Sequence, residues 1–521
     1  MIGEAALLGL ALQGLADRMQ DSLLATAQSP VAREGQDCAA ALFLPDGRVL
    51  AQARGLPLLL GGMIPAVAGI LGQFPAATMA EGEGYLTNDP WSGGTHLPDI
   101  ILLRPVLVAG RVVALAATIL HHQDVGGIAP GSIPPDATSL FQEGLRLPPL
   151  RWRDATGEQP GIAAILRANS RTPAMLAADL AAQWAAVSLA AREVAALAAG
   201  IADFAGLAEA LLAESRAQLA AGLLALPEGE ARAEAVLEGD GLTADPVPIR
   251  VALRRIAGPR LVVDFAGSAP QTAGPVNAAA SGLLAAAFCL LRRIAPGAAA
   301  NHGLLDLLDL HLPEGSVVNP RFPAAVNART ATVKLATNAL LAALADLSPA
   351  PAAASNAGVA VVLSAAGEGW MFTEIIAGGA GGGPAGPGLP AISVDVSNAR
   401  NLPAETLEAI APIRVEDIAR RAGSGGVGRM PGGEGTRRVY RLLTGRAEVS
   451  YRGERHLAGA PGAQGGGAGA PAALTLVGTD GSVRRFPAKC RFAWVAGEQL
   501  IIETAGGGGW GTPPEEENEH G

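Results

Sequence analysis

The spacing of apolar residues along the first part of the chain alternates between a helical and a strand-like period. Residues 4–28 repeat apolar side chains at helical intervals and are rich in Ala and Leu, which predicts an opening helix. Segments 38–44 and 48–51 flank the turn Pro45-Asp46-Gly47, a pattern typical of a β-hairpin. Residues 62–73 again have a helical pattern. This part of the chain therefore mixes helices with hairpin strands.

Two further strands and a long helical stretch follow. Strands are predicted at 100–107 and 112–120, joined by a turn around Ala109-Gly110. Residues 160–224 are rich in Ala and contain almost no helix breakers, which predicts a helical hairpin or bundle segment. The sequence Leu226-Pro227-Glu228-Gly229 then interrupts the pattern and marks a boundary.

Beyond this boundary, strands are predicted at 249–253 and 260–265, and Ala-rich helices at 278–295 and 332–346. Glycine then dominates four segments: 376–389, 422–435, 461–470 and 506–511. Such runs commonly form flexible linkers. Here Asp, Asn, Arg and Trp interrupt them, which favours ordered loops that approach a site closely.

The pattern as a whole predicts a mixed α/β (α+β) protein with more than one domain. We expect an N-terminal region, 1–225, with β-hairpins and an Ala-rich helical segment. A glycine-rich α/β region, 226–521, would follow it. The length of 521 residues agrees with this division, because it is too great for one compact core.

Composition narrows the class of protein. Hydrophobic residues make up 49% of the chain and charged residues 17%, so most of it should fold. The net charge of -10 argues against a nucleic-acid surface, since phosphate binding needs clustered Lys and Arg. The acidic end of the chain is expected to fray; it contains Glu515, Glu516, Glu517 and Glu519.

The N-terminus and the apolar runs do not indicate export or membrane insertion. Met1-Ile2-Gly3-Glu4 lacks the basic start of a signal peptide. The apolar run 56–71 contains Pro and Gly and falls short of an uninterrupted span of about 20 residues. Cys38, Cys289 and Cys490 lie far apart, as expected for reduced thiols. We therefore expect a cytoplasmic protein with no membrane partner.

Three of the seven histidines fall within 27 positions, on either side of the two predicted strands. His96 and Asp99 precede the first strand, and His121 and His122 follow the second. If the strands pair antiparallel, His96 and Asp99 meet His121 at one edge. Imidazole nitrogen and carboxylate oxygen are the ligands expected for Zn²⁺ or Mn²⁺. Histidines that cap turns and aspartates that bind loop amides are the alternative, but the cluster favours a metal site.

At these residues the sequence resembles the hydantoinase B family. That family includes the matching part of ATP-hydrolysing 5-oxoprolinases and a subunit of acetone carboxylase-type enzymes. The two blocks that carry the resemblance are 88–99 and 121–127, and the match runs nearly end to end. The remaining blocks occur in the same order: 130–132, 142–144, 170–173, 264–268, 274–277, 313–316, 398–403, 424–428, 431–433 and 506–511.

The resemblance implies a site for one divalent ion, Zn²⁺ or Mn²⁺, whose ligands are Asp37, His96, Asp99 and His121. His122 and Asp124 would then orient a ligand or move a proton. Either of them is a candidate for the catalytic general base. Region 1–225 becomes the metal-binding catalytic region, and region 226–521 supplies the loops near the site.

The sequence departs from the family pattern around this site. Leu59 and Ser92 stand where relatives often have histidine, and Gln36 stands where a basic residue is usual. Met430-Pro431 stands where relatives often have arginine. The four predicted ligands are intact, so these departures bear on the choice of substrate and on activity.

The resemblance implies the B subunit of an ATP-dependent cyclic-amide hydrolase. In the family, ATP activates the carbonyl of a lactam or hydantoin in an A-type partner of a hetero-oligomer, and water then attacks it. Neither Lys334 nor Lys489 follows the phosphate-binding pattern Gly-x-x-x-x-Gly-Lys-[Ser/Thr], so ATP is expected on the partner. Two alternatives stay open: a ketone carboxylase subunit like that of acetone carboxylase, and a non-catalytic subunit stabilised by the metal.

Overall fold

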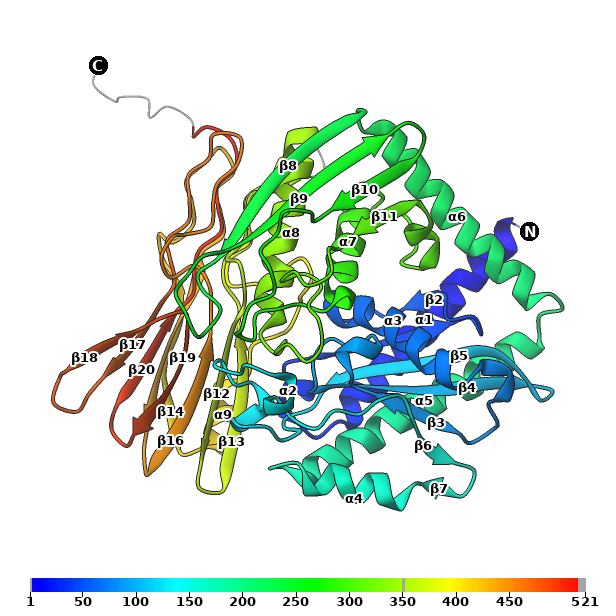
Figure 1. Ribbon diagram of the computed structural model, residues 1–521, viewed down its shortest axis with the longest axis horizontal. Helices are drawn as coiled ribbons and strands as arrows, with labels where there is room; N and C mark the ends of the chain where they lie inside the picture. Colours follow the sequence, from blue (N-terminus) through cyan, green and yellow to red (C-terminus); the bar gives the residue numbers. More distant parts are fainter. Residues whose placement is uncertain (1, 349–351, 514–521) are drawn as a thin grey trace.

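The computed structural model describes residues 2–348 and 352–513 (Figure 1). The acidic end with Glu515, Glu516, Glu517 and Glu519 lies outside the described residues. Across the described part, helices pack against several β-sheets, which confirms the predicted mixed α/β class with more than one domain.

The largest sheet has seven strands in the order β2-β1-β5-β4-β3-β6-β7. Both predicted hairpins are confirmed, since β1 pairs with β2 and β4 with β5, each antiparallel. From Ala114 to His121 every residue of β5 is buried, because helices cover both faces of the sheet. The strands are β1 (Cys38–Phe43), β2 (Val49–Gln52), β3 (Gly84–Thr87), β4 (Asp99–Val108), β5 (Arg111–His121), β6 (Leu150–Asp154) and β7 (Gly157–Glu158).

Alternate residues of these strands enter two different cores. Ile100 and Leu102 of β4 pack with helices α1 and α5, whereas Ile101 and Leu103 pack with helix α3. The predicted helical stretch 160–224 is confirmed as three successive helices. The helices of this region are α1 (Ile2–Thr26), α2 (Pro30–Arg33), α3 (Pro57–Gln73), α4 (Pro160–Ala168), α5 (Pro173–Ala199) and α6 (Phe204–Ala225). Helix α3 starts earlier than predicted, because Pro57 suits the first turn of a helix.

A second layer lies on the α3 side of this sheet. Helix α7 (Ala280–Ile294) packs on α3, and α8 (Arg329–Leu347) packs on α7 and against β8 and β9. The second sheet has the order β11-β10-β9-β8. Its strands are β8 (Gly229–Leu237), β9 (Val247–Ile256), β10 (Arg260–Asp264) and β11 (Leu308–His311). One core therefore joins elements from both sides of the division at 225/226, which falls in the connection between α6 and β8.

Strand β8 shows tertiary packing overriding local preference. Its Ala and Glu content favours a helix. The segment nevertheless pairs antiparallel with β9 along its whole length. Ala231, Ala233 and Ala235 then face the core, while Glu230 and Glu234 face solvent. This segment consists of helix-forming residues, but alternate side chains are buried, as in a half-buried strand.

The C-terminal third forms two further sheets, seen as the yellow, orange and red strands of Figure 1. Their orders are β13-β12-β16-β19 and β14-β15-β20-β17-β18. Phe372, Tyr440 and Trp494 belong to a core that the two sheets share. The elements are β12 (Val361–Gly367), β13 (Trp370–Ile376), α9 (Ala404–Ile410), β14 (Ile413–Arg421), β15 (Gly435–Leu442), β16 (Arg446–Arg452), β17 (Ala473–Val477), β18 (Val483–Phe486), β19 (Lys489–Val495) and β20 (Gln499–Glu503). Short 3-10 turns are η1 (Ala76–Thr78), η2 (Pro90–Ser92), η3 (Pro130–Ser132), η4 (Leu140–Gln142) and η5 (His302–Leu307).

The four glycine-rich segments form ordered structure by pairing with one another. The amide of Gly382 donates to the Gly508 carbonyl at 2.9 Å, and that of Gly507 donates to the Gly433 carbonyl at 2.9 Å. A Cβ atom at Gly507 would lie 1.9 Å from the carbonyl oxygen of Ala380. Only glycine allows backbones to approach this closely, so each glycine-rich segment packs directly against the backbone of another.

We predict that Gly507→Ala destabilises the protein by about 3 kcal/mol, because its Cβ meets backbone that cannot rotate away. The matched control is Gly297→Ala, where a Cβ meets nothing within 4 Å and a change within about 0.5 kcal/mol is expected. Urea unfolding of both variants measures the difference. Equal midpoints would contradict the close packing of the glycine-rich segments.

Candidate metal centre

The β4–β5 hairpin brings together residues that are 22 positions apart. Asp99, the first residue of β4, is the direct antiparallel partner of His121, the last residue of β5. His96 lies in the turn before β4, where its carbonyl accepts a hydrogen bond from the Asp99 amide. All three side chains are buried, with exposed fractions of 0% for Asp99, 1% for His96 and 7% for His121. The predicted meeting of these residues at one edge of the hairpin is confirmed.

Three ligand atoms converge on one point. His96 Nε2 lies 2.9 Å from Asp99 Oδ1, and His121 Nδ1 lies 3.0 Å from the same oxygen. The two imidazole nitrogens are 3.0 Å apart. Ligands of a tetrahedral zinc ion with bonds of 2.0–2.1 Å are about 3.3 Å apart, so a small outward shift would admit an ion.

The protonation of the triad suits a cation. Burial, with Arg329 nearby, holds the pKa of His96 well below its usual range, so the ring is neutral and its nitrogen lone pair is available. Burial opposes ionisation of Asp99, but His96 and Arg329 hold the pKa of that carboxyl well below its usual range. The neutral imidazole of His96, the imidazole of His121 and one carboxylate form a donor set that Zn²⁺ and Mn²⁺ accept.

The second oxygen of Asp99 is held by separate donors. Arg329 Nη2 donates to Asp99 Oδ2 at 2.6 Å, and the Thr95 hydroxyl donates to the same atom. These contacts leave Oδ1 turned toward the two histidines. Asp99 is therefore oriented to offer a single oxygen to an ion, the arrangement that hydrogen bonds around a metal ligand typically enforce.

A small cavity lies beside the triad and is lined by His96 and His121. The fourth predicted ligand, Asp37, lies on the wall of this cavity. It sits just before β1, and its backbone carbonyl accepts a hydrogen bond of 3.0 Å from the His121 amide. Burial raises the pKa of the Asp37 carboxyl to about 6, although His121 opposes the shift. Its carboxylate lies outside the compact triad formed by His96, Asp99 and His121. A cation at the triad would compensate the burial of this fourth acid.

The cavity beside the triad is small and has an apolar side. Its volume is about 40 Å³. Leu59 lines it, at the position where the resemblance predicts histidine, so this departure falls on the cavity itself. Ser92 instead donates to Asp89 at 3.0 Å, and Met430 pairs with the Trp510 backbone. The other lining residues include Leu56, Leu58, Thr330, Val362, Thr373, Ile375, Ser397 and Arg452.

His122 lies on the opposite side of the sheet from His121. Successive residues of an extended strand point to opposite faces. His122 Nε2 accordingly lies 3.0 Å from Gln183 Oε1 of helix α5. Burial lowers the pKa of His122, so its ring is neutral. These contacts favour a role in holding the end of β5 in place.

Asp124 is fully occupied by hydrogen bonds within its loop. Its Oδ1 accepts from the amides of Gly126 at 3.0 Å and Arg171 at 2.8 Å. Its Oδ2 accepts from the Gly131 amide at 3.2 Å and from Arg171 Nη1 at 2.9 Å. A carboxylate with four donors holds a loop in one conformation, so the geometry favours a positioning role for Asp124.

Two arginines that complete the site were not among the predicted residues. Arg329 begins helix α8, and Arg452 ends strand β16. Arg452 Nη1 donates to Asn327 Oδ1 at 2.6 Å, and burial lowers its pKa to about 9. The signal for Arg329 lay in the sequence as a charge at the start of a largely apolar helix, where a buried charge is expected to be paired.

Comparison with known proteins identifies relatives that match almost the whole chain. The family described as Hydantoinase B/oxoprolinase matches residues 4–513. An uncharacterised protein of Methanocaldococcus jannaschii is 30% identical over 96% of this chain and 89% of its own length. The 5-oxoprolinase of Dictyostelium discoideum is 29% identical over 95% of this chain, which spans only 39% of that longer protein. The caprolactamase subunit beta of Pseudomonas jessenii is 28% identical over 96% of this chain and 89% of its own.

Two solved structures share the fold. The ATP-dependent caprolactamase of Pseudomonas jessenii superposes with a TM-score of 0.88 at 26% identity, over 98% of this chain and 92% of that one. Nucleotide-free acetone carboxylase superposes with a TM-score of 0.89 at 17% identity, over 98% and 75% of the two chains, which shows the fold alone. The match over almost the whole chain shows that this protein belongs to the hydantoinase B/oxoprolinase family.

Proposed function

We propose that this chain is the B-type subunit of an ATP-dependent cyclic-amide hydrolase. It would act in the cytoplasm in a hetero-oligomer with an A-type partner. The observation that carries the proposal is the buried convergence of His96, Asp99 and His121 on one point, 2.9 to 3.0 Å from one another. A relative named caprolactamase subunit beta covers nearly the whole chain, which supports a lactam or hydantoin as substrate.

The proposed ligands of one divalent ion, Zn²⁺ or Mn²⁺, are Asp37, His96, Asp99 and His121. A divalent ion bound there activates water and stabilises negative charge on oxygen. Arg329 fixes the Asp99 carboxylate and brings a second positive charge to the cavity. Leu59 adds an apolar side chain to the cavity lining, which suits the methylene groups of a ring.

The substrate needs more space than the cavity offers in this state. Sites for small molecules commonly have volumes of about 300–1,000 Å³, whereas the cavity measures about 40 Å³. Part of the wall must therefore move when a ring binds. Helix α3 begins in this wall with Leu58 and Leu59, and Ser397 lies in it as well.

The nucleotide is proposed to bind to the partner subunit. The sequence around Lys334 and Lys489 lacks the phosphate-binding pattern. The solved relative is described as an ATP-dependent caprolactamase. A division of labour follows, in which the partner activates the carbonyl with ATP and this chain hydrolyses the activated bond.

The metal itself is the first test. Protein purified without chelator is expected to carry about one divalent ion per chain by elemental analysis. The double variant His96→Ala/His121→Ala should lose the ion, because two of the converging ligands are removed. His311→Ala is the control, since that exposed histidine pairs with Asp264 elsewhere in the fold. Full occupancy in the double variant would refute the assignment.

A pair of isosteric variants separates binding of the ion from support of the site. Asp99→Asn removes the charge that balances the cation, so occupancy should fall sharply. Asp124→Asn should retain the ion at saturating metal, because that carboxylate is bound by Arg171 and loop amides. Its metal affinity should weaken by at most about 10–100-fold, and turnover should fall. If Asp124→Asn loses metal as completely as Asp99→Asn, then Asp124 is itself a ligand.

Measurements of ATP hydrolysis test whether this chain needs an A-type partner. The isolated chain is expected to hydrolyse no ATP above background. The co-expressed A-type subunit should form a stable complex with it and release phosphate when a lactam or hydantoin is supplied. The control is the same complex without a cyclic amide. Robust ATP hydrolysis by the isolated chain would contradict the division of labour.

A further inference from the structure

Lys334 is a buried cation in the middle of helix α8. It is one of two lysines in the chain and is 3% exposed. The other, Lys489, forms an ion pair with Glu454. Within the described ranges 2–348 and 352–513, the Lys334 side chain has no ion-pair partner. Its one side-chain hydrogen bond runs from Nζ to Ser393 Oγ at 3.2 Å. An ammonium group that is buried without a carboxylate needs a physical reason.

The hydrogen bond from Lys334 continues toward the metal cavity. Ser393 Oγ donates to Ser397 Oγ at 2.9 Å, and each of these serines is 7% exposed. Ser397 lines the cavity that His96, His121 and Arg329 also line. Donation thus runs in one direction, from the ammonium group through two hydroxyls to the cavity wall.

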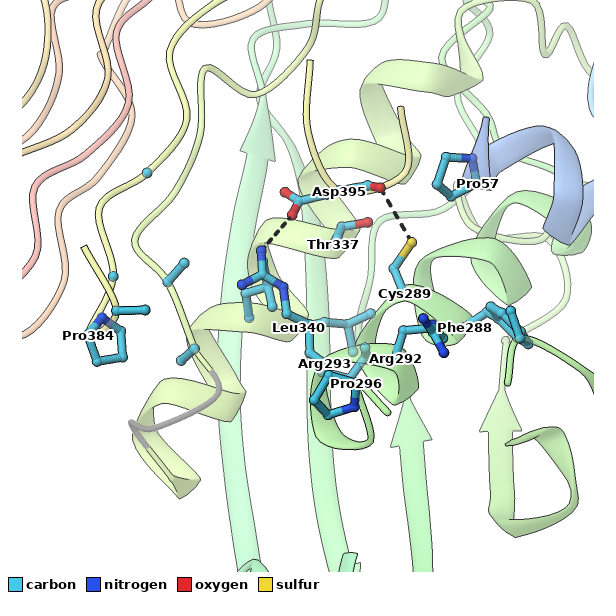
Figure 2. Close-up of a pocket in the computed structure, with 18 of the residues that line it drawn as sticks. Pro57, Phe288, Cys289, Arg292, Arg293, Pro296, Thr337, Leu340, Pro384 and Asp395 are labelled. Carbon is cyan, nitrogen blue, oxygen red and sulfur yellow. Dashed lines mark hydrogen bonds and ion pairs between the residues drawn. The ribbon is translucent and has the colours of Figure 1, made fainter. Parts of the chain in front are cut away.

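The titratable neighbours of Lys334 line a large pocket. The charged or titratable groups facing the ammonium are Asp395, in the loop beside α8, and Cys289 of helix α7. Both line a pocket of about 790 Å³ that also includes the exposed Arg293. Figure 2 shows Asp395 next to Thr337 of α8 and joined to Cys289 and Arg293 by dashed contacts. Two neighbours of Lys334 thus line this pocket, while the serines that it binds through hydrogen bonds lead to the metal cavity.

We propose that Lys334 is a positioning residue that delivers a proton to the metal cavity through Ser393 and Ser397. The proposal rests on the proposed function, because hydrolysis of a cyclic amide creates the demand for a proton. Neither the metal ligands nor Asp124 and His122 meet this demand, since their contacts hold them in other roles.

The proton balance is simple. Water adds to the ring carbonyl carbon and loses one proton to solvent, the carbon–nitrogen bond breaks, and the departing nitrogen takes up a proton to become an amine. Ser397 gives that proton and receives one from Ser393, which in turn receives one from Lys334 Nζ. Lys334 is left as a neutral amine and regains a proton from solvent. Burial lowers the pKa of Lys334 to about 8, against the opposing charge of Asp395, so the group can release a proton near neutral pH.

Turnover of the metal-loaded complex over a range of pH tests this relay. Wild type should lose activity as pH rises through the Lys334 pKa of about 8, because only the protonated form delivers a proton. Lys334→Met and Ser397→Ala should slow turnover by about 10- to 100-fold and abolish this basic limb. Lys334→Arg should be equally slow, since guanidinium keeps the charge but does not release a proton at these pH values.

The matched control is Thr337→Val, on the same helix, whose hydroxyl donates within α8 to the Val333 carbonyl. It should keep the wild-type pH profile. A Lys334→Met complex that carries metal and turns over with an unchanged profile would overturn the relay alone. Absence of any ring opening by the wild-type complex would instead refute the proposed function.

A spectroscopic measurement on the isolated, zinc-loaded chain is independent of turnover. With only two lysines, [¹³Cε]lysine labelling yields two signals, and Lys489→Arg identifies which one belongs to Lys334. The Lys334 signal should titrate with a midpoint of about 8, and Ser397→Ala should shift that midpoint, because the hydroxyl chain is broken. A Lys334 signal that does not respond to Ser397→Ala would overturn the proposed connection.

Discussion

The site depends on the buried ion pair between the Asp99 carboxylate and Arg329. One oxygen of this carboxylate faces His96 and His121, while the other accepts hydrogen bonds from Thr95 and Arg329. Arg329 comes from helix α8, far along the chain, so this carboxylate ties the seven-stranded sheet to the second layer. Removing one partner of such a buried ion pair commonly costs about 3–5 kcal/mol. A site that needs a charged Asp99 therefore also fixes how the two layers pack.

Other side chains near the triad are also held by hydrogen bonds. Asp124 holds the loop after β5 through Arg171 and two amides, and His122 holds the end of β5 against α5. In the C-terminal third, close packing holds the glycine-rich segments against one another, since their backbones lie at distances that no side chain permits. Ligand positions that vary little are what a metal centre requires, because hydrogen bonds around ligands set their orientation.

Much of the fold, and the meeting of His96, Asp99 and His121, follow from the local sequence. The two hairpins and the helical stretch 160–224 were predictable because the period of apolar residues and the turn residues are local signals. The triad was predictable for the same reason, since a tight antiparallel pair brings Asp99 opposite His121. Strand β8 was not predictable from its composition, because pairing with β9 outweighs the helix preference of Ala and Glu.

The sequence by itself therefore determined the family, the class of fold and the convergence of His96, Asp99 and His121. Only the tertiary structure decided what surrounds them. Arg329 and Lys334 reach their partners across 230 and 59 residues, and nothing in local spacing encodes such contacts. Asp124 and His122 are candidate catalytic groups in the sequence, and only the structure shows that they bind Arg171, loop amides and Gln183. Long-range packing bears on such roles, because burial and the position of distant charges influence which side chain is free to react.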